Sequence, residues 1–341
     1  MVIAEDEMGS RRDVAKAANV SVRTVSNVVN GFAHVSESTR LRVLRAVAEL
    51  DYRPSELARS LKRGRSGLIA LVLPELDTPY FAELTRAFVE EGHKRGLTVV
   101  IDQTDGDLER ERYLIDRTEY GSLFDALVIS PLALTPAHLD GIAESRPLVF
   151  LGESLFPRFD QVMIDNRLAA REAVTHLINT GRRRVAAIGA ERDIRGSSSQ
   201  RLAGYLEALN DAGRDVGLSY VEYVDTFRRS SGAAAMDRLL DRADPPDAVF
   251  CFSDPLALGA MRALLARGVR VPDDVAIIGF DDIEDGAFST PTLSTVTPDR
   301  RFIARVALDR VEQKLGGAQT PGPTVTIAPH HLTIRESSSP A

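Results

Sequence analysis

The sequence predicts a small all-α head followed by a larger α/β part with parallel sheets in two lobes. Short helical patterns with apolar spacing fill residues 10–53, too little chain for an enzyme cleft. From Leu68 onward, apolar runs of strand length alternate with amphipathic stretches, which is typical of parallel sheets covered on both faces. The charge changes as well, because residues 10–65 hold twelve Lys/Arg against five Asp/Glu while the whole chain carries −7.

The composition excludes several classes of protein. No segment approaches the roughly 20 consecutive apolar residues that a membrane helix requires. Residues 1–9 form an acidic extension with Glu5, Asp6 and Glu7, unlike a secretory signal. The single cysteine, Cys251, rules out an internal disulfide framework and offers no metal cluster. We therefore expect a protein of the reducing cytoplasm, without metal or cofactor.

The first helix of the head is predicted for residues 11–18, after Ser10, with Val14, Ala17 and Ala18 on its inner face. Asn19 then tolerates the left-handed conformation that a tight turn between helices needs. Ser21 suits the N-cap of a second helix, from Val22 to about Asn30. The inward positions of this second helix are Val25, Val28 and Val29.

A third helix is expected after Ser36 or Ser38. Its predicted inner face consists of Leu41, Leu44, Val47 or Ala48, and Leu50. Pro54 is well placed to begin a further short helix that runs to Lys62, and a linker follows. A helix this short is marginal in water on its own. The predicted domains are thus a head (residues 10–53), a hinge helix and linker (54–66) and a core (67–341).

The core is predicted to contain two sheets, because so many strand-length runs exceed one domain. The first lobe is expected to comprise about 67–165 and 295–325, and the second about 166–294 and 326–336. Residues 337–341 are expected to be disordered. The predicted strands are Leu68–Leu73, Leu97–Ile101, Ala126–Ile129, Leu148–Leu151, Val162–Ile164, Val185–Ile188, Val221–Val224, Ala248–Phe252, Val275–Phe280, Leu293–Val296, Thr324–Ile327 and Leu332–Ile334.

The segment from Asp13 to Lys62 resembles the lactose-repressor/galactose-repressor (LacI/GalR) family of bacterial regulators. Its turn, second helix, third helix and hinge motif carry the resemblance, and the family's core pattern extends through residue 336. The resemblance implies a helix-turn-helix head, a sensor like the periplasmic sugar-binding proteins, and a homodimer on operator DNA. Two departures are visible: Asn19 stands where glycine is usual, and Asn27 stands where arginine is frequent.

The second helix is the candidate DNA reader. If its valines face inward, Val22, Arg23, Ser26 and Asn27 face outward, where they could contact base edges in the major groove. Ser21, Thr24 and Ser26 suit phosphate contacts. The resemblance also implies hinge contacts by Arg59, Leu61 and Lys62, with Leu61 as a minor-groove wedge. The alternatives are a helix that only packs within the head and a leucine that only packs on the core.

Candidate effector residues follow the predicted strands, because ligands of parallel sheets bind beyond the carboxyl ends of the strands. The resemblance adds Arg195 and Arg201 (in the pattern RLAGY) and Asp281 (in GFDD), with Tyr80 or Phe81 as a stacking platform. Alternatively, Asp281 caps a helix, Arg201 forms a surface ion pair and Phe81 belongs to the core. The full predicted set is Tyr80, Phe81, Gln103, Ser130, Asp165, Arg195, Arg201, Ser253 and Asp281.

Two function classes remain. The first is a transcription regulator, a repressor of a palindromic operator, whose DNA affinity depends on a small effector, with a sugar expected by family habit. The second is a solute-binding protein or a sugar enzyme with an incidental head, for which the Asp281, Asp282 and Asp285 carboxyls could serve glycoside hydrolysis. The basic head and the unlikeness of the start to a secretory signal favour the first class, which has no catalytic residues. No G-x-x-x-x-G-K-[ST] or G-x-S-x-G motif supports an enzyme.

Overall fold

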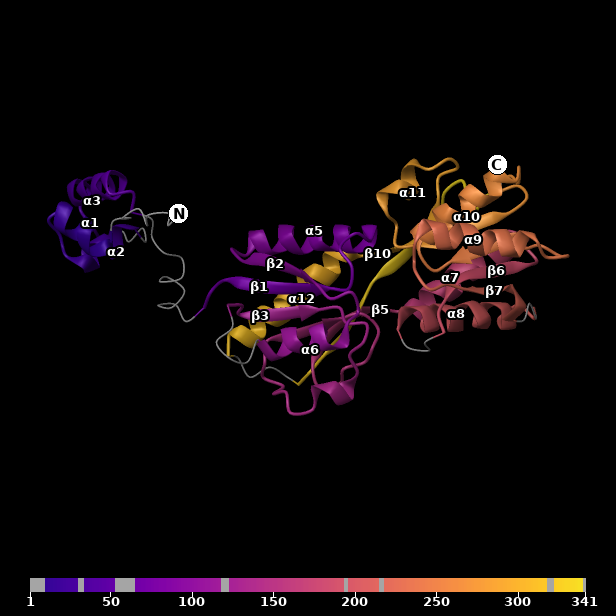
Figure 1. Cartoon of the computed structure of the whole chain (residues 1–341), viewed down its shortest axis with the longest axis horizontal. Coiled ribbons are helices and arrows are strands. Elements are labelled where there is room, and N and C mark those ends of the chain that lie inside the picture. The colour runs from indigo at the N-terminus through magenta and orange to yellow at the C-terminus, as the bar shows by residue number, and fades with distance from the viewer. Residues whose placement is uncertain are drawn as a thin grey trace, which may run out of the picture. The chain divides into compact units, whose positions relative to one another are not determined.

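The computed structural model describes residues 10–29, 34–52, 65–117, 123–192, 196–214, 218–317 and 322–339. The chain divides into two compact units, Met1–Gly67 and Leu68–Ala341 (Figure 1). The first unit contains the head. The second unit is the two-lobed core, and its lobes each contain one six-stranded sheet.

The head contains three helices, α1 (Arg11–Ala17), α2 (Val22–Val29) and α3 (Glu37–Glu49). A capping box begins α1, because Ser10 Oγ accepts from the Asp13 amide while the Asp13 carboxylate accepts from the Ser10 amide. Asn19 has φ = 51°, which confirms the predicted left-handed turn. Ser21 Oγ accepts from the Thr24 amide at 3.0 Å, so the first turn of α2 is also capped by a side chain.

The core of the head differs from the prediction at two helices. On α1, Ala15 is buried and Ala17 is exposed, and on α3 the buried positions are Val43 and Ala46. Leu41 and Leu44, which we expected inside, are 58% and 48% exposed. More than half of the α3 surface is apolar, through residues 41, 43, 44, 46 and 47. Helical spacing alone therefore could not decide whether the face with Leu41 and Leu44 or the face with Val43 and Ala46 is buried.

The first lobe contains a parallel sheet in the order β11-β5-β4-β3-β1-β2. On β1, Ile69 and Leu71 face α5 (Pro79–Lys94) and α12 (Arg300–Leu315), whereas Ala70 and Val72 face α6 (Leu108–Arg117). A short helix, η1 (Pro136–Leu139), lies on the α6 side. The strands are β1 (Leu68–Leu73), β2 (Thr98–Gln103), β3 (Ala126–Ile129), β4 (Leu148–Leu151), β5 (Asp160–Ile164) and β11 (Val325–Ala328).

The second lobe repeats this architecture with the order β12-β10-β9-β8-β6-β7, in which only the β10–β12 pair is antiparallel. Helices α7 and α8 cover one face, and α9 and α10 cover the other. The strands are β6 (Val185–Ala190), β7 (Val221–Tyr223), β8 (Ala248–Cys251), β9 (Ala276–Phe280), β10 (Ser294–Pro298) and β12 (His330–Thr333). The helices are α7 (Asn166–Asn179), α8 (Ser197–Asp211), η2 (Leu218–Tyr220), α9 (Arg229–Leu240), α10 (Asp254–Ala266) and α11 (Glu284–Phe288).

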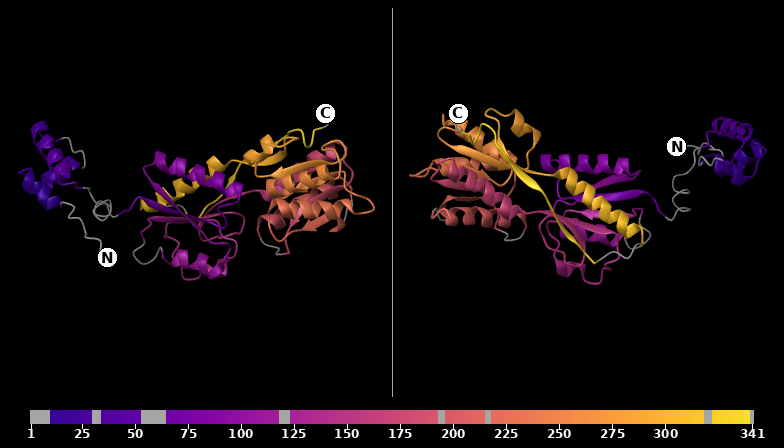
Figure 2. Two further views of the ribbon diagram at one scale, coloured as in Figure 1. Left: turned by 45° about the horizontal axis from the view of Figure 1, so that its top comes forward. Right: turned by 180° about the vertical axis from the view of Figure 1, so that it is seen from behind.

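The chain crosses between the lobes three times (Figure 2). The crossings follow β5, β10 and β11. In the sequence, α12 therefore comes between two strands of the second lobe, β10 and β12, although it packs in the first lobe. This corrects two predicted boundaries. β10 pairs with β9 and β12, so residues 295–298 belong to the second lobe, and β11 pairs with β5, so residues 326–328 belong to the first. Strand-like apolar patterns cannot reveal which sheet a strand joins.

Residues 337–339 are ordered, contrary to the prediction, and residues 340–341 lie outside the described residues. Ser337 and Ser338 are fully buried. The Ile277 amide donates to the Ser337 carbonyl at 2.8 Å, and Ser337 Oγ donates to the Ile277 carbonyl at 2.7 Å and accepts from the Ser294 amide at 2.8 Å. This polar segment therefore supplies hydrogen bonds to β9 and β10 that its composition does not suggest.

We expect Ser337→Ala to destabilise the core, because it leaves the Ser294 amide and one acceptor site on the Ile277 carbonyl without their partner. Each buried polar group left unsatisfied costs about 1–3 kcal/mol. Urea unfolding followed by circular dichroism measures the change in the free energy of unfolding. Ser339→Ala is the matched control, and equal stabilities of the two variants would contradict this role for Ser337.

Candidate functional site

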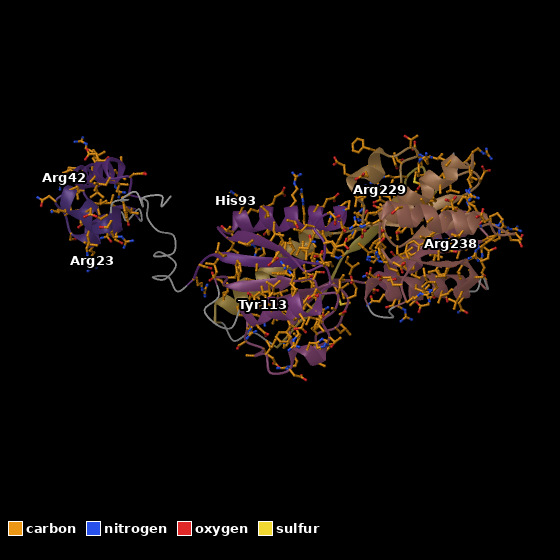
Figure 3. All side chains as sticks on the ribbon, viewed as in Figure 1. Arg23, Arg42, His93, Tyr113, Arg229 and Arg238 are labelled. Atoms are coloured by element: carbon orange, nitrogen blue, oxygen red, sulfur yellow. The ribbon has the colours of Figure 1, made fainter. Side chains whose placement is uncertain are left out.

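The first turn of α2 forms an exposed polar surface on the head. Val25 and Val28 are buried, Val22 is 43% exposed, and Arg23 projects to solvent (Figure 3). Ser21 is exposed, and Thr24, Ser26 and Asn27 are half-buried. The Ser21 and Thr24 hydroxyls lie 2.8 Å apart and hydrogen-bond to one another. The positions predicted to face DNA therefore lie on the accessible side of α2, while its other face packs against α1 and α3.

Four predicted site residues lie outside the described residues. They are three hinge residues and one residue of the loop after β6: Arg59, Leu61, Lys62 and Arg195.

Arg201, on α8, lies at the junction of the two lobes and is 7% exposed. Its Nε donates to Asn166 Oδ1 at 2.7 Å, and its Nη1 donates to the Phe252 carbonyl. The guanidinium carbon is 3.5 Å from the centroid of the Phe280 ring, so the cation stacks on an aromatic face. Arg201 is thus a buried group and not a surface ion-pair residue.

Glu153 and Asn166 link this arginine to the first lobe. Glu153 follows β4, and its Oε1 accepts from Asn166 Nδ2 at 2.7 Å. Burial raises the pKa of the Glu153 carboxyl, although the Arg201 charge and the Asn166 hydrogen bond act in the opposite direction. Neither residue was among the predicted effector contacts.

Asp281 follows β9 and is 7% exposed. Within the described ranges, no group donates a hydrogen bond to its carboxylate, and α11 begins after Ile283 without a side-chain cap, so Asp281 does not cap that helix. Burial raises the pKa of Asp281 to about 7, although the charges of Arg201 and Arg300 act to lower it. The carboxyl group therefore has free acceptor capacity beside two guanidinium groups.

The backbone at Asp281 and Asp282 is held in an unusual conformation, with φ = 114° and 53°. Arg300, at the start of α12, donates to both carbonyls and forms an ion pair with Glu83 of α5, with 2.8 Å between Nη2 and Oε2. Such strained residues persist only where the surroundings hold them. Arg300 of the first lobe therefore supports the Asp281 loop of the second lobe.

Tyr80, in the first turn of α5, belongs to the same region. Burial raises the pKa of its hydroxyl, and the charges of Asp281 and Glu153 raise it further. Phe81 contacts Tyr80 edge to face, with 5.3 Å between the ring centroids, and it packs against the main apolar cluster. We call the set around Arg201 the junction cluster: Tyr80, Glu153, Asn166, Arg201, Asp281 and Arg300.

Three other predicted effector residues hold the protein's own backbone. Gln103 accepts from the Leu76 amide at 3.0 Å and so fixes the loop between β1 and α5. Asp165 caps α7 by accepting from the Leu168 amide at 2.9 Å, and Ser253 caps α10 by accepting from the Leu256 amide at 3.4 Å. Ser130 is half-buried after β3. Their placement at strand ends follows the predicted pattern, but capping uses the side-chain oxygens of Asp165 and Ser253.

The rule that ligands bind beyond strand ends could have found Glu153 and Asn166, since each lies two residues after the end of its strand, β4 or β5. Arg300 gave no such signal, because it begins a helix after the second crossing. A pocket of about 780 Å³ lies against α5 and α12 and shares Arg300 with the junction cluster. Its wall also includes Glu83 and Asp282, but none of the predicted effector residues.

Two features are absent from the described part of the chain. No group of three His, Cys, Asp or Glu side chains there could hold a metal ion. None of the helices in the described ranges is both long and apolar enough to cross a membrane.

We expect Asp281→Asn to raise the melting temperature most at pH 8, less at pH 5, and to leave it nearly unchanged below pH 3.8. The folded-state pKa of about 7 lies above the ordinary value of 3.8, so ionisation of Asp281 removes stability as pH rises between those values. One pKa unit corresponds to about 1.4 kcal/mol. Differential scanning calorimetry of Asp281→Asn beside the exposed control Asp285→Asn tests this, and a pH-independent difference would contradict it.

Comparison with known proteins supports the same division of the chain. Residues 12–55 match the model of bacterial regulatory proteins of the lacI family, and residues 174–338 match the periplasmic binding protein-like domain. The chain is 37% identical to the HTH-type transcriptional regulator CelR of Thermobifida fusca, over 95% of this chain and 96% of CelR.

Two solved structures have the same fold. A CelR–cellobiose complex is 33% identical and covers 96% of this chain and 99% of its own, with a TM-score of 0.70. A lac repressor dimer bound to operator and the anti-inducer ONPF is 26% identical and covers 97% and 99%, with a TM-score of 0.83. The head, the two-lobed core and these matches together show that the chain belongs to the LacI family of bacterial transcription regulators.

Proposed function

We propose that this regulator is a cytoplasmic repressor that binds a palindromic operator as a homodimer, and that a small sugar bound between the lobes sets its affinity for DNA. The observation that carries the DNA-binding part is the exposed first turn of α2, with Val22 and Arg23 at the surface of a basic head. Recognition helices insert this end into the major groove.

The contacts that we propose on the head follow from the chemistry of the exposed groups. Arg23 pairs with a guanine edge, Asn27 with an adenine edge, and Val22 meets a thymine methyl group. The hydroxyls of Ser21, Thr24 and Ser26 contact phosphates. In the hinge, Leu61 wedges between base pairs, and Arg59 and Lys62 contact the backbone.

An exposed apolar edge supports the homodimer. β2 is the outer strand of the first sheet, and its Val100 and Ile101 are both more than one third exposed. Val89 on the neighbouring helix α5 is also exposed. An unpaired apolar strand edge is a liability unless something covers it. A second copy of the chain is the occupant we propose, as in the lac repressor dimer, since two-fold symmetry matches a palindromic site.

The junction cluster is the site that we propose for the effector. The Asp281 carboxylate can accept hydrogen bonds from sugar hydroxyls, and Arg201 retains N–H groups beyond the two that are bound. Tyr80 and Phe81 offer aromatic surface for a sugar ring. The CelR complex with cellobiose supports a glucose-based saccharide as the effector class. Arg195, Gln103 and Ser130 complete the proposed set, and Asp165 and Ser253 shape its floor.

The effector acts on DNA through the lobes. A sugar between them stabilises one relative orientation of the lobes, which changes the spacing of the two hinge segments in the dimer and hence the affinity for the operator. A coupling free energy of about 1–3 kcal/mol, or roughly 5–150-fold in affinity, is typical of such linkage.

We expect Arg23→Ala to lose discrimination at one base pair, at a cost of about 1–3 kcal/mol. Operators are selected from a random palindromic library, and fluorescence anisotropy then measures affinity for the selected site and its single-base variants at two salt concentrations. Arg42→Ala, an exposed arginine of α3, removes the same charge and is the matched control. A uniform loss on every sequence would reassign Arg23 to a phosphate contact.

We expect Asp281→Ala to abolish the response to the effector while operator affinity in its absence is retained. The readout is operator affinity with and without cellobiose and a panel of related sugars. Asp285→Ala, which removes an exposed carboxylate paired with Arg229, is expected to respond like the wild type. If Asp281→Ala still responds, the junction cluster is not the effector site, and if no sugar changes wild-type affinity, the effector class is wrong.

A further inference from the structure

Asn166 occupies a particular position in the chain. It is the first residue of α7 and directly follows Asp165, where the chain first crosses from one lobe to the other. Its side chain is fully buried. A buried amide with partners in two lobes must be rearranged when those lobes rotate.

The Asn166 amide uses both of its polar atoms. Nδ2 donates to Glu153 Oε1 at 2.7 Å and to the Ile164 carbonyl at 3.2 Å, and both acceptors lie on the first lobe. Oδ1 accepts from Arg201 Nε at 2.7 Å, on the second lobe. The amide thus connects a carboxylate of one sheet's strand end to a guanidinium of the other lobe.

Arg201 itself is held firmly within the second lobe. It donates to the Phe252 carbonyl beyond β8 and stacks on Phe280 at the end of β9. Glu153 belongs to the segment after β4, in the first lobe. A rotation of the lobes therefore cannot leave both hydrogen bonds of Asn166 intact.

Two other contacts described here also join the lobes. Arg300 of the first lobe donates to the Asp281 and Asp282 carbonyls of the second, so it holds the loop after β9 and does not involve the chain crossing at Asn166. Arg228 of the second lobe forms an ion pair with Asp77 of the first at 3.0 Å, but both side chains are more than half exposed. Exposed pairs typically contribute little to stability. A buried hydrogen bond to a charged group contributes more, and a buried partner left unsatisfied destabilises the fold.

We propose that Asn166 is a positioning residue that holds the two lobes in the orientation seen here, by joining Glu153 to Arg201. The inference deepens the proposed effector function, because any occupant that contacts Arg201 or Glu153 acts directly on this link. It predicts that a change at this amide alters the relative orientation of the lobes even without effector or DNA, and with the Arg300 contacts intact.

The test measures the distance between the lobes in two single variants, at Glu153 and Asn166, and in the double variant that combines them. Spin labels are attached to Glu109→Cys on α6 and Arg262→Cys on α10, both exposed positions, while Cys251 is buried. Double electron–electron resonance on the full chain, diluted with unlabelled protein, gives the distance distribution within one subunit. The measurement needs neither sugar nor operator, so its outcome is independent of whether the proposed effector class is correct.

Asn166→Asp is the decisive variant. It keeps the acceptor for Arg201 but places a carboxylate against Glu153, and an acidic residue at the start of α7 is favourable for the helix itself. We expect a second, displaced population in the distance distribution. Glu153→Gln alone preserves an acceptor for Asn166 and is expected to match the wild type.

The double variant Glu153→Gln/Asn166→Asp restores a donor–acceptor pair with the roles exchanged, so the displaced population is expected to shrink. Asn179→Asp, the same change at the exposed far end of α7, is the matched control and is expected to match the wild type. A wild-type distribution for Asn166→Asp, or no recovery in the double variant, overturns the proposal.

A loss of folding is separated from a change in lobe orientation by a further variant. Glu153→Ala leaves Asn166 in place but removes its acceptor from the first lobe. It is expected to show the displaced population with an intact circular dichroism spectrum. A wild-type distribution in this variant would also overturn the proposal.

Discussion

The burial of one guanidinium group constrains the whole core. A charge removed from water must be paired and hydrogen-bonded, or it destabilises the fold. Arg201 meets this requirement through the Asn166 amide, the Phe252 carbonyl and the Phe280 ring. The Glu153 carboxylate of the first lobe is hydrogen-bonded to that same amide. The strand ends of both sheets must therefore meet at this point, and the effector site that we propose lies where they do.

The same requirement explains why the Asp281 carboxyl is poised between its two protonation states. It lies in a region that burial makes unfavourable for charge, while Arg201 and Arg300 favour the ionised form. Because no described donor satisfies it, its acceptor capacity is available to a bound molecule. A buried carboxyl group without a donor lowers the stability of the fold but can bind a ligand, and such trade-offs are common at functional sites.

The sequence predicted most of this architecture because parallel strands buried on both faces appear as continuous apolar runs, and each predicted run overlaps a strand. Two kinds of feature were not predictable. Helical spacing did not separate Val43 from Leu41 and Leu44 on α3, and polar composition concealed the buried Ser337. Of the junction residues, Glu153 and Asn166 follow strands and the strand-end rule could have found them, whereas Arg300 begins a helix and reaches the Asp281 loop through a contact that no local pattern encodes.

The three crossings also have a consequence for biosynthesis. Each lobe is assembled from stretches that are distant in the chain, so a nascent polypeptide cannot complete either sheet until β11, β12 and the buried serines have left the ribosome. The head needs only residues 10–52 for its apolar core and can fold as soon as it emerges. Translation thus produces a folded reader well before a finished sensor, and during that interval unpaired strands are the main risk of aggregation.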